Sequence, residues 1–428
     1  MTPLDAPFDT RPADWLGYDE ARARILAEAR PLPAEPVSVL AARGRVLAAP
    51  LTAPFRLPPW DNSAMDGYAV RAQDLDPQDP TPLVVVGESR AGGPTVGPLG
   101  AGQAIRIMTG APVPPGADAV VRAEDTHLDG EHLVVERAVA AGRNIRRGGE
   151  DFEAGASIGE VGALLTPARI ALLVAAGCTE IPVHRRPRVS VLTSGDELLP
   201  PGSVDAVRQG HGVIDSNSAM LVAQAREAGA EAASTLALPD RADALRAGIE
   251  RACAGTDLLV TVGGASVGAH DLFKRVLDGM GYRPSFWRIR MRPGSPVSFG
   301  HLPGPDGPVA VLGLPGNPSS AFVTFELFGR PYLEALAGLR QPGPRTARAR
   351  AGVALVGASG LTVFARVRVR DDGAERVVEP TGPQGSGLIS PLASADALAL
   401  IPPDPGRIAA GAPCDILWLG RSPGAPDA

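Results

Sequence analysis

Three stretches in the middle of the chain combine an apolar run with a loop of small polar and acidic residues. They cover residues 189–198 (VSVLTSGDEL), 258–271 (LLVTVGGASVGAHD) and 311–322 (VLGLPGNPSSAF). Each apolar run is typical of a buried strand, and each loop leads toward a helix. Loop amides and helix N-termini attract anions beyond the carboxyl ends of strands. The pattern therefore predicts a phosphate-binding site at these strand ends.

Acidic side chains in the first two loops could add a divalent cation to this site. Gly195 allows a sharp turn, and Asp196 and Glu197 then lie at the mouth of the first loop. Carboxylates are the ligands that hard divalent cations prefer. Asp271, at the end of the second loop, could face the same metal or cap the next helix. For Asp196 the alternative is also helix capping, and the residues alone leave both roles open.

The second and third loops offer backbone and hydroxyl groups. In the second, glycines would let the backbone approach a ligand closely and a serine offers a hydroxyl: Gly263, Gly264, Gly268 and Ser266. A tight structural turn explains the same pattern. In the third, Pro315 and Pro318 stiffen the chain, while Gly316 relaxes it. Asn317 could then bind a ligand or cap a rigid turn, a capping role that is also open to Ser319.

Arginines and one more aspartate extend this set. Arg290 and Arg292 precede a Pro-Gly turn, and an arginine fork suits bidentate binding of oxyanions. A solvated surface pair is the alternative. Asp215 could touch sugar hydroxyls or a metal. Because Asp215 directly precedes a helical pattern, capping by Asp215, Ser216 or Asn217 is equally compatible with the sequence.

The bulk composition limits the class of protein. The chain has 428 residues, which suggests about three domains. A net charge of −6 and an aromatic content of 4% predict no nucleic-acid partner. Three widely spaced cysteines without CxxC spacing predict reduced thiols. No signal peptide is evident, and residues 170–178, the most apolar helical stretch, are far fewer than the ~20 that span a bilayer. We therefore expect a cytoplasmic protein with no membrane partner.

Helix and strand patterns define the elements that must position these loops. Residues 18–30 have helical spacing. Residues 31–155 alternate short β-branched runs with Gly and Pro, which predicts strands and hairpins. A second helix has clear punctuation, because Thr166 can cap it, Pro167 fits its first position and Gly177 can end it.

From residue 188 onward, strand-like and helix-like segments alternate, which predicts a mostly parallel sheet covered on both faces. A basic linker follows at residues 339–350. Beyond it, residues 363–370 (VFARVRVR) alternate strictly, and later runs predict a small β domain. The sequence holds no Walker loop, GxSxG elbow or HExxH pair. The residues alone describe an anion-handling α/β enzyme with extra domains, in which a metal could assist.

Four runs, taken together and in this order, resemble the molybdopterin molybdenumtransferases, whose animal relatives form the E domain of gephyrin. They are residues 58–70 (PPWDNSAMDGYAV), 106–121 (RIMTGAPVPPGADAVV), 142–155 (GRNIRRGGEDFEAG) and 381–390 (TGPQGSGLIS). The α/β runs described above complete the resemblance, which extends from about Tyr18 to near Leu419. The combination of DNSAMDGYAV, MTGAPVP and LPGNP is highly specific, although each alone is much less so.

The resemblance implies a multidomain α/β protein. A doubly wound, mostly parallel α/β domain, similar to molybdopterin adenylyltransferase, is expected beside a β-rich protruding domain, a linking domain and a C-terminal β-barrel. The implied bounds are residues 1–55 with 146–187 for the discontinuous linking domain, 56–145 for the second, 188–338 for the α/β domain and 345–428 for the barrel. The resemblance also implies an elongated homodimer, with the cleft between the α/β domain of one subunit and the second domain of its partner.

The implied reaction inserts molybdate into adenylylated molybdopterin, releases AMP and gives molybdenum cofactor. Mg²⁺ or another divalent cation would assist it. Transient contact with a molybdopterin adenylyltransferase and with molybdoenzyme acceptors is implied as well. Two alternatives stay open, namely a catalytically weakened molybdopterin-binding scaffold of the same fold and a molybdopterin adenylyltransferase. The two key runs near residues 61–70 and 108–114 favour the transferase, because an adenylyltransferase would not need them.

The resemblance also implies roles for individual residues. The metal would be held by Asp196, Glu197 and Asp271. Catalytic roles are implied for Asp66, Thr109, Asp151, Glu197, Asp240 and Asp271, with helix capping as the alternative for Asp240. Cofactor-binding roles are implied for Thr193, Ser194, Gly195, Asp215, Ser216, Gly263, Gly264, Ser266, Gly268, Arg292, Pro315, Gly316, Asn317, Arg366 and Ser386.

The chain departs from the family pattern at three positions. Relatives usually have an acid in place of Ala269 and a lysine in place of Ser295, and often a lysine in place of Arg292. The missing ammonium at Ser295 weakens the expected anion site. Arg288, Arg290 or Arg292 could compensate for its loss.

Overall fold

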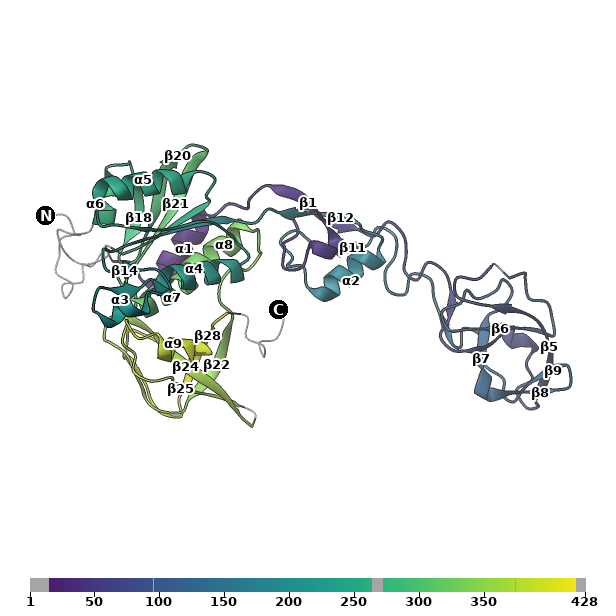
Figure 1. The fold of residues 1–428 in the computed structure, drawn as a ribbon. Helices are drawn as coiled ribbons and strands as arrows, with labels where there is room; N and C mark the ends of the chain where they lie inside the picture. Colours follow the sequence, from purple (N-terminus) through teal and green to yellow (C-terminus); the bar gives the residue numbers. More distant parts are fainter. Residues whose placement is uncertain (1–14, 95, 264–271, 374, 421–428) are drawn as a thin grey trace.

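The computed structural model of the chain describes residues 15–94, 96–263, 272–373 and 375–420. The domains are arranged along one elongated molecule (Figure 1). The α/β domain and the C-terminal β domain form one end, a small linking domain lies in the middle, and a β-rich domain forms the other end. No helix among these described residues is both long and apolar enough to cross a membrane.

The α/β domain is built on a six-stranded sheet of order β16-β13-β17-β21-β20-β18. In this order the strands are Glu231–Leu238, Arg188–Ser194, Leu258–Val262, Gly307–Leu314, Ser298–Gly304 and Arg283–Trp287. The first four are parallel, and the last two are antiparallel. Every residue of β17 (LLVTV) is buried, as expected for a central strand with both faces covered.

Helices cover both faces of this sheet. One face packs on α4 (Ser216–Glu227), α7 (Pro318–Thr324), a π-helical turn (Phe325–Gly329), α8 (Arg330–Leu336) and α1 (Tyr18–Glu28). The opposite face packs on α5 (Ala242–Cys253) and α6 (Leu272–Asp278). The predicted doubly wound, mostly parallel sheet is confirmed. The buried side of α1 shares the first of these cores, although α1 lies within residues 1–55, which were expected to belong to the linking domain.

The linking domain is formed by two distant stretches of chain. Antiparallel pairs join β1 (Ala34–Ser38) to β12 (Glu180–His184) and β2 (Leu51–Thr52) to β11 (Ser157–Gly159). A short 3-10 turn (Val39–Ala41) and α2 (Pro167–Ala175) complete it. The Thr166 side chain accepts the Arg169 N–H, and Gly177 has a φ of 83° just after α2 ends, so the predicted helix signals are confirmed.

The β-rich domain contains a six-stranded sheet of order β7-β4-β6-β5-β9-β8. These strands are Ala119–Arg122, Gly67–Val70, Gln103–Ile107, Thr81–Ser89, His132–Val135 and Thr126–Asp129. Two small 3-10 turns (Ala72–Asp74 and Ala123–Asp125) adjoin them. Apolar clusters cover both faces of the sheet. The short pair β3 (Asn62–Ser63) and β10 (Ile145–Arg146) connects this domain to the linking domain.

The C-terminal domain is a closed five-stranded barrel, as predicted. Its order is β24-β25-β22-β28-β26, and an additional pairing between β24 and β26 closes it. The strands are Thr362–Asp372, Glu375–Pro380, Thr346–Ala351, Pro413–Trp418 and Ala397–Ile401. The barrel therefore begins inside the stretch expected as a linker. Smaller elements are β23 (Leu355–Val356), β27 (Arg407–Ile408) and α9 (Ser390–Ala393).

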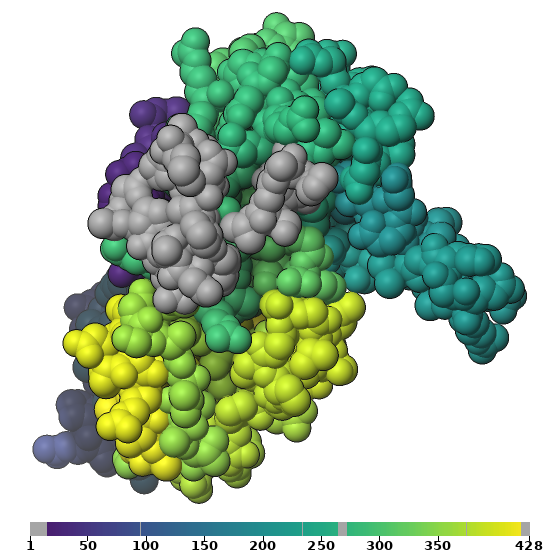
Figure 2. Space-filling model, turned by 90° about the vertical axis from the view of Figure 1, so that its left-hand side faces the viewer, coloured from purple at the N-terminus to yellow at the C-terminus, as the bar shows by residue number. Residues whose placement is uncertain are grey.

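The barrel lies directly against the α/β domain (Figure 2). A short strand of the α/β region, β19 (Met291–Arg292), pairs with β24 of the barrel. Phe364, Leu398 and Leu417 of the barrel belong to the core that α1 and α8 share. The two domains consequently share one continuous hydrophobic core, which fixes the loops at their junction.

Candidate active site at the strand ends

The loops that follow β13, β17 and β21 lie side by side. Thr193 is opposite Val262, and Val262 is opposite Leu314, so the three strands end at the same level. Gly263 has a φ of 115°, and a Cβ there would lie 2.9 Å from the Ser194 carbonyl oxygen. A side chain at Gly263 does not fit. The close approach of these loops leaves their backbone groups near one another, which is the geometry of a phosphate-binding edge.

Asp215 is the centre of a hydrogen-bond network at this edge. Its Oδ2 accepts the Thr193 hydroxyl at 2.8 Å and the Ser218 hydroxyl at 2.5 Å. Its Oδ1 accepts the Ser218 N–H at 3.1 Å, which makes Asp215 the N-cap of α4. Of the roles that the sequence left open for Asp215, the structure shows capping. The cap also anchors the tip of β13 to α4.

The third loop joins this edge to the barrel. Asn217 donates from Nδ2 to the Gly316 carbonyl at 2.7 Å. Asn317 donates from Nδ2 to the Ser386 hydroxyl at 3.2 Å. The Ser319 hydroxyl donates to the Leu388 carbonyl at 2.6 Å. Asn317 is the N-cap residue of α7, but its side chain makes no capping hydrogen bond and its Nδ2 donates to Ser386 instead.

Asn217 and Ser218 were missed as site residues by the sequence analysis. Asn217 is half-buried, and its Oδ1 has no hydrogen-bond partner among the described residues. The sequence could have indicated both residues, because residues two and three positions after a capping aspartate lie at the same helix end as that aspartate. If Asp215 belongs to the site, Asn217 and Ser218 lie beside the site as well.

Arg366 of β24 is the largest fully buried side chain in the described structure, with an exposure of 0%. Its Nη2 donates to the carbonyls of Pro383 at 3.0 Å and Gly385 at 3.2 Å. Its Nε and Nη1 have no partner within the described residues. Burial lowers the pKa of this guanidinium below its ordinary value. A buried arginine without a carboxylate is costly, and an anionic ligand would offset that cost.

The acidic residues of the first loop are exposed. Asp196 accepts the Asp240 N–H at 3.1 Å through Oδ1 and caps no helix, so the capping alternative for Asp196 is wrong. The helix α5 begins at Ala242 and takes Arg241 as its N-cap, so Asp240 is not the cap that the sequence allowed. Glu197 is exposed beside them. Within the described ranges, no three acidic, histidine or cysteine side chains are grouped to hold a metal.

Some expected site residues lie outside the described residues. They are Gly264, Ser266, Gly268 and Asp271, together with the departure Ala269. Asp271 was expected as the third metal ligand, so the proposed metal site is described here only by Asp196 and Glu197.

Asp66 and Thr109 form a pair in the β-rich domain. The Asp66 Oδ1 accepts both the Thr109 N–H and the Thr109 hydroxyl, each at 2.7 Å. These two hydrogen bonds lower the pKa of the exposed Asp66 carboxyl, and the bond from the hydroxyl contributes most. Asp151 lies near the connection to the linking domain, where its N–H donates to the Leu57 carbonyl at 2.9 Å. The side chain of Asp151 is exposed.

This pair lies far from the strand ends. The β-rich domain is at the opposite end of the molecule from the α/β domain (Figure 1). Within one chain, the structure therefore joins Thr193, Asp215, Gly316, Asn317 and Ser386 but does not bring Asp66 to them.

Around Ser295 and Arg292, where the chain departs from the family pattern, most side chains have structural roles. Ser295 is buried and donates to the Ile289 carbonyl at 2.7 Å, so it closes a turn and does not face solvent. Arg288 is buried against Trp15, with its guanidinium carbon 5.4 Å from the ring centroid. Arg292 is exposed on β19, beside the barrel strand that bears Arg366. Of the three arginines named as compensating cations, Arg292 has the accessible side chain next to that strand.

Family models match nearly the whole described chain. Residues 16–177 match a MoeA N-terminal region (domain I and II), residues 190–335 a probable molybdopterin binding domain, and residues 348–419 a MoeA C-terminal region (domain IV). The fold and these matches thus place the chain among proteins with a probable molybdopterin binding domain and three associated domains.

Curated relatives make the family specific. A "Molybdopterin molybdenumtransferase 2" of Mycobacterium tuberculosis is 38% identical over 91% of this chain and 95% of its own. A molybdopterin molybdenumtransferase of Haemophilus influenzae is 35% identical over 92% of this chain and 96% of its own. The chain belongs to the molybdopterin molybdenumtransferase family. A solved molybdopterin biosynthesis moeA protein of Pyrococcus horikoshii has a TM-score of 0.81 at 27% identity, covering 95% of this chain and 100% of the other.

Proposed function

We propose that this chain inserts molybdate into adenylylated molybdopterin, releases AMP and gives molybdenum cofactor. The names of the relatives support the transfer of molybdenum to molybdopterin. The single structural observation that supports the site is Arg366, a fully buried guanidinium whose Nε and Nη1 have no partner among the described residues. It lies next to the loop that contains Ser386.

Molybdate is a tetrahedral oxyanion, and a charged guanidinium donates strong hydrogen bonds to such an anion. In our proposal, Arg366 donates one hydrogen bond to molybdate from a nitrogen atom that lacks a partner among the described residues. The Ser386 hydroxyl, which accepts a hydrogen bond from Asn317, adds a second donor. Arg292 would supply a positive charge that steers the anion toward the junction.

The adenylylated substrate has a pyrophosphate group, which suits the strand-end loops. Backbone N–H groups of these loops and the N-terminus of α4 would bind its phosphate oxygens. Gly263 and Gly316 have no side chain that would block such an approach, and a Cβ at Gly316 would lie 3.9 Å from the Gly263 Cα. Asp215 would position this edge, because it fixes Thr193 to α4.

Asp196 and Glu197 would hold Mg²⁺ at this edge. Magnesium keeps several waters and typically binds one or two carboxylates together with substrate phosphates, so two adjacent exposed acids suit it. When bound, the ion would polarise the phosphate oxygens and balance the charge that develops on AMP. Asp196 is held in place by the Asp240 N–H.

A homodimer would complete this cleft. Asp66 and Thr109 are exposed in the β-rich domain, which lies at the opposite end of the molecule from the α/β domain (Figure 1). A second copy must therefore supply them if they act at the strand ends. Two large apolar side chains near Asp66 are unusually exposed, Trp60 at 50% and Met65 at 44%. Exposed apolar side chains next to polar ones are typical of a protein contact. In this arrangement the partner's Asp66 would face the phosphates.

The proposed reaction defines the other partners. An adenylyltransferase would supply the adenylylated substrate and molybdoenzymes would accept the product, through transient contacts in the cytoplasm. An exposed edge at the junction of two domains is compatible with such transfer.

Incubation of the purified protein with adenylylated molybdopterin, magnesium and molybdate tests the proposal. We expect AMP release that depends on molybdate and molybdenum that stays with the molybdopterin. Tight binding of the substrate without AMP release would indicate a scaffold. Formation of the adenylylated species from ATP would indicate an adenylyltransferase.

A further inference from the structure

A cavity lies away from the strand ends. It has a volume of about 1120 Å³ and opens where the linking domain, the α/β domain and the barrel meet. Residues 157–160 of the linking domain, residues 227–229 at the end of α4, and Arg376 and Trp418 of the barrel contribute to its wall. None of the residues joined at the strand ends lines it. We call it the arginine cavity.

The wall of the arginine cavity is strongly positive. Nine arginines and four glutamates line it, and no lysine or aspartate does. The whole chain, in contrast, has a net charge of −6. Among the residues that line the cavity, arginines therefore outnumber glutamates by five, although carboxylates behind the wall pair with some of these arginines.

The four glutamates of the wall are already paired. Arg330 is buried and lies 2.7 Å from Glu326, 3.0 Å from Glu227 and 4.0 Å from Glu334. The fourth, Glu160, lies 2.8 Å from Arg340. The negative charge of the wall is therefore taken up by two of its nine arginines.

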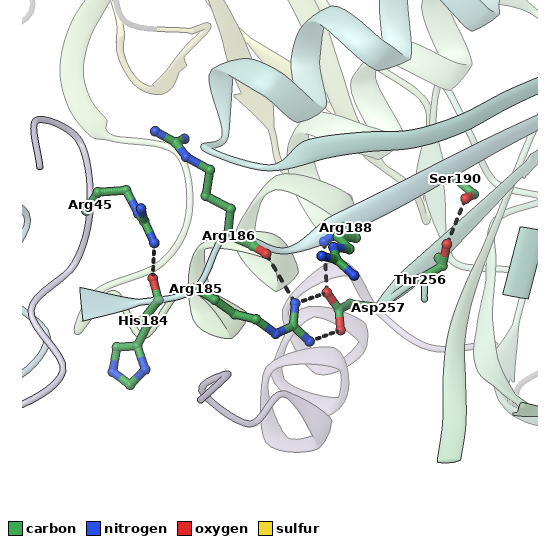
Figure 3. A network of polar contacts seen from close by, with 8 residues as sticks. All are labelled: Arg45, His184, Arg185, Arg186, Arg188, Ser190, Thr256 and Asp257. Carbon is green, nitrogen blue, oxygen red and sulfur yellow. Dashed lines mark hydrogen bonds and ion pairs between the residues drawn. The ribbon is translucent and has the colours of Figure 1, made fainter. Parts of the chain in front are cut away.

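Two other arginines of the wall have structural roles (Figure 3). Arg185 forms a two-pronged ion pair with Asp257, with both distances 2.7 Å. Arg45 is buried, donates to the His184 carbonyl at 2.8 Å and pairs with Glu35 at 2.5 Å. These contacts fix the connection between the linking domain and the sheet. The Arg186 side chain points in a different direction from the Arg185–Asp257 pair.

Three of the five remaining arginines are held only by backbone carbonyls within the described residues. Arg22 donates to Pro342 at 2.8 Å, Arg169 to Leu164 at 2.6 Å, and Arg186 to Gly229 at 3.1 Å. None of the three has a carboxylate in ion-pair contact there. These contacts position each guanidinium but leave its charge uncompensated.

The residues around Arg22 leave space for its guanidinium group at the wall of the cavity. Its Nε is buried and has no partner among the described residues. A Cβ at Gly343, which has a φ of 122°, would lie 2.5 Å from the Arg22 Nη2. Glycine at this position thus leaves room for the guanidinium at the cavity.

We propose that the arginine cavity binds a small anion that has phosphate groups. Phosphate oxygens accept paired hydrogen bonds from guanidinium forks, and three arginines without a carboxylate in ion-pair contact suit an anion with two phosphates. The volume is sufficient for a nucleotide-sized ligand. Because α1, α2 and the 185–188 connection each contribute an arginine, the anion holds the linking domain against the α/β domain.

Calorimetric titration of the full chain with pyrophosphate at low ionic strength tests this site. The double variant Arg22→Gln with Arg186→Gln should weaken one binding step at least about tenfold, or ~1.4 kcal/mol. Arg24→Gln is the matched control, because Arg24 lies on the same helix but is exposed and paired with Glu20. It should bind pyrophosphate as the wild type does.

Hydrogen exchange of the wild-type protein locates the anion without a mutation. Pyrophosphate should protect the backbone of residues 159–164 and 340–345, which line the cavity. Equal affinity of the double variant and the wild type, or protection confined to the strand-end loops, would overturn the proposal. A parallel titration with ADP identifies the source: tighter binding of ADP indicates a nucleotide, and equal binding indicates any diphosphate.

Discussion

Arg366 combines two properties that rarely occur together at the scale of one residue. It is fully buried, yet two of its nitrogen atoms lack a partner among the described residues. Burial of a charge without compensation disfavours the folded state. We therefore interpret Arg366 as a ligand-binding group whose burial lowers the stability of the fold, a trade-off that is common at active sites.

Arg366→Gln should separate activity from stability. We expect molybdate-dependent AMP release to fall at least about tenfold, equivalent to ~1.4 kcal/mol of barrier. The free energy of unfolding, measured by urea denaturation, should stay unchanged or rise, because a buried charge is removed. The matched control is Arg370→Gln, an exposed arginine of the same strand that pairs with Glu379. Loss of activity in the control, or retention in Arg366→Gln, would contradict the proposed role.

The Asp66 carboxyl provides a prediction about pH. Because Thr109 lowers the folded-state pKa of Asp66, the carboxylate stays ionised at a pH where an ordinary aspartate is protonated. Its contribution to stability is present above the unfolded pKa of about 4 and is lost as the pH falls through the lower folded value.

Thr109→Val should raise the pKa of Asp66 toward its ordinary value, because the hydroxyl hydrogen bond is removed. The measurement is a carboxyl-carbon NMR titration. Asp61 is the internal control, since its pKa is lowered mainly by the Gly148 N–H and should not move. An unchanged Asp66 titration would mean that the hydroxyl bond is not formed in solution.

At the scale of elements, the N-terminus of α4 has both a structural and a proposed binding role. Asp215 caps the helix and also accepts the Thr193 hydroxyl from β13. The cap therefore joins a strand end to the helix that covers it, and any loss of the cap should loosen the site together with the helix.

Asp215→Ala should destabilise the protein by about 1–2 kcal/mol, because the cap and the Thr193 acceptor are both lost. Asp215→Asn should cost less, since an asparagine oxygen can still cap α4. Urea denaturation of the two variants measures the difference. Equal destabilisation would show that the charge of Asp215, rather than its capping hydrogen bond, stabilises α4.

At the scale of the whole molecule, the elongated shape separates residues that the proposed reaction needs together. The β-rich domain, which contains Asp66, lies at one end, and strand β24, which contains Arg366, lies at the other (Figure 1). If a second copy completes the cleft, each cleft contains residues from two chains, and two inactive variants can complement each other.

Mixing Asp66→Asn with Arg366→Gln should restore AMP release. After equal mixing and exchange of subunits, about a quarter of the wild-type rate is expected, because half of the dimers are mixed and each holds one intact cleft. Each variant alone should stay inactive. Failure of the mixture, with subunit exchange verified by light scattering and mass spectrometry, would place Asp66 outside a shared cleft.

The sequence predicted the layers of the fold well, because periodicity reports local burial directly. The alternation of β and α segments predicted the doubly wound sheet, and Thr166, Pro167 and Gly177 predicted the ends of α2. Capping was harder to predict. Asp215, Asp240 and Asn317 all precede helices, but only Asp215 uses its side chain as the cap. The sequence pattern alone does not show which hydrogen-bond partner a side chain has in the folded protein.

By itself, the sequence determined which elements form and which loops follow apolar strands, since both depend on neighbours within a few residues. Only the tertiary structure decided that Arg366, in a strictly alternating strand, is fully buried, and that the Asn317 loop meets Ser386. The Asn317–Ser386 contact joins positions 69 residues apart. It depends on how the barrel packs against the α/β domain, which no local pattern encodes.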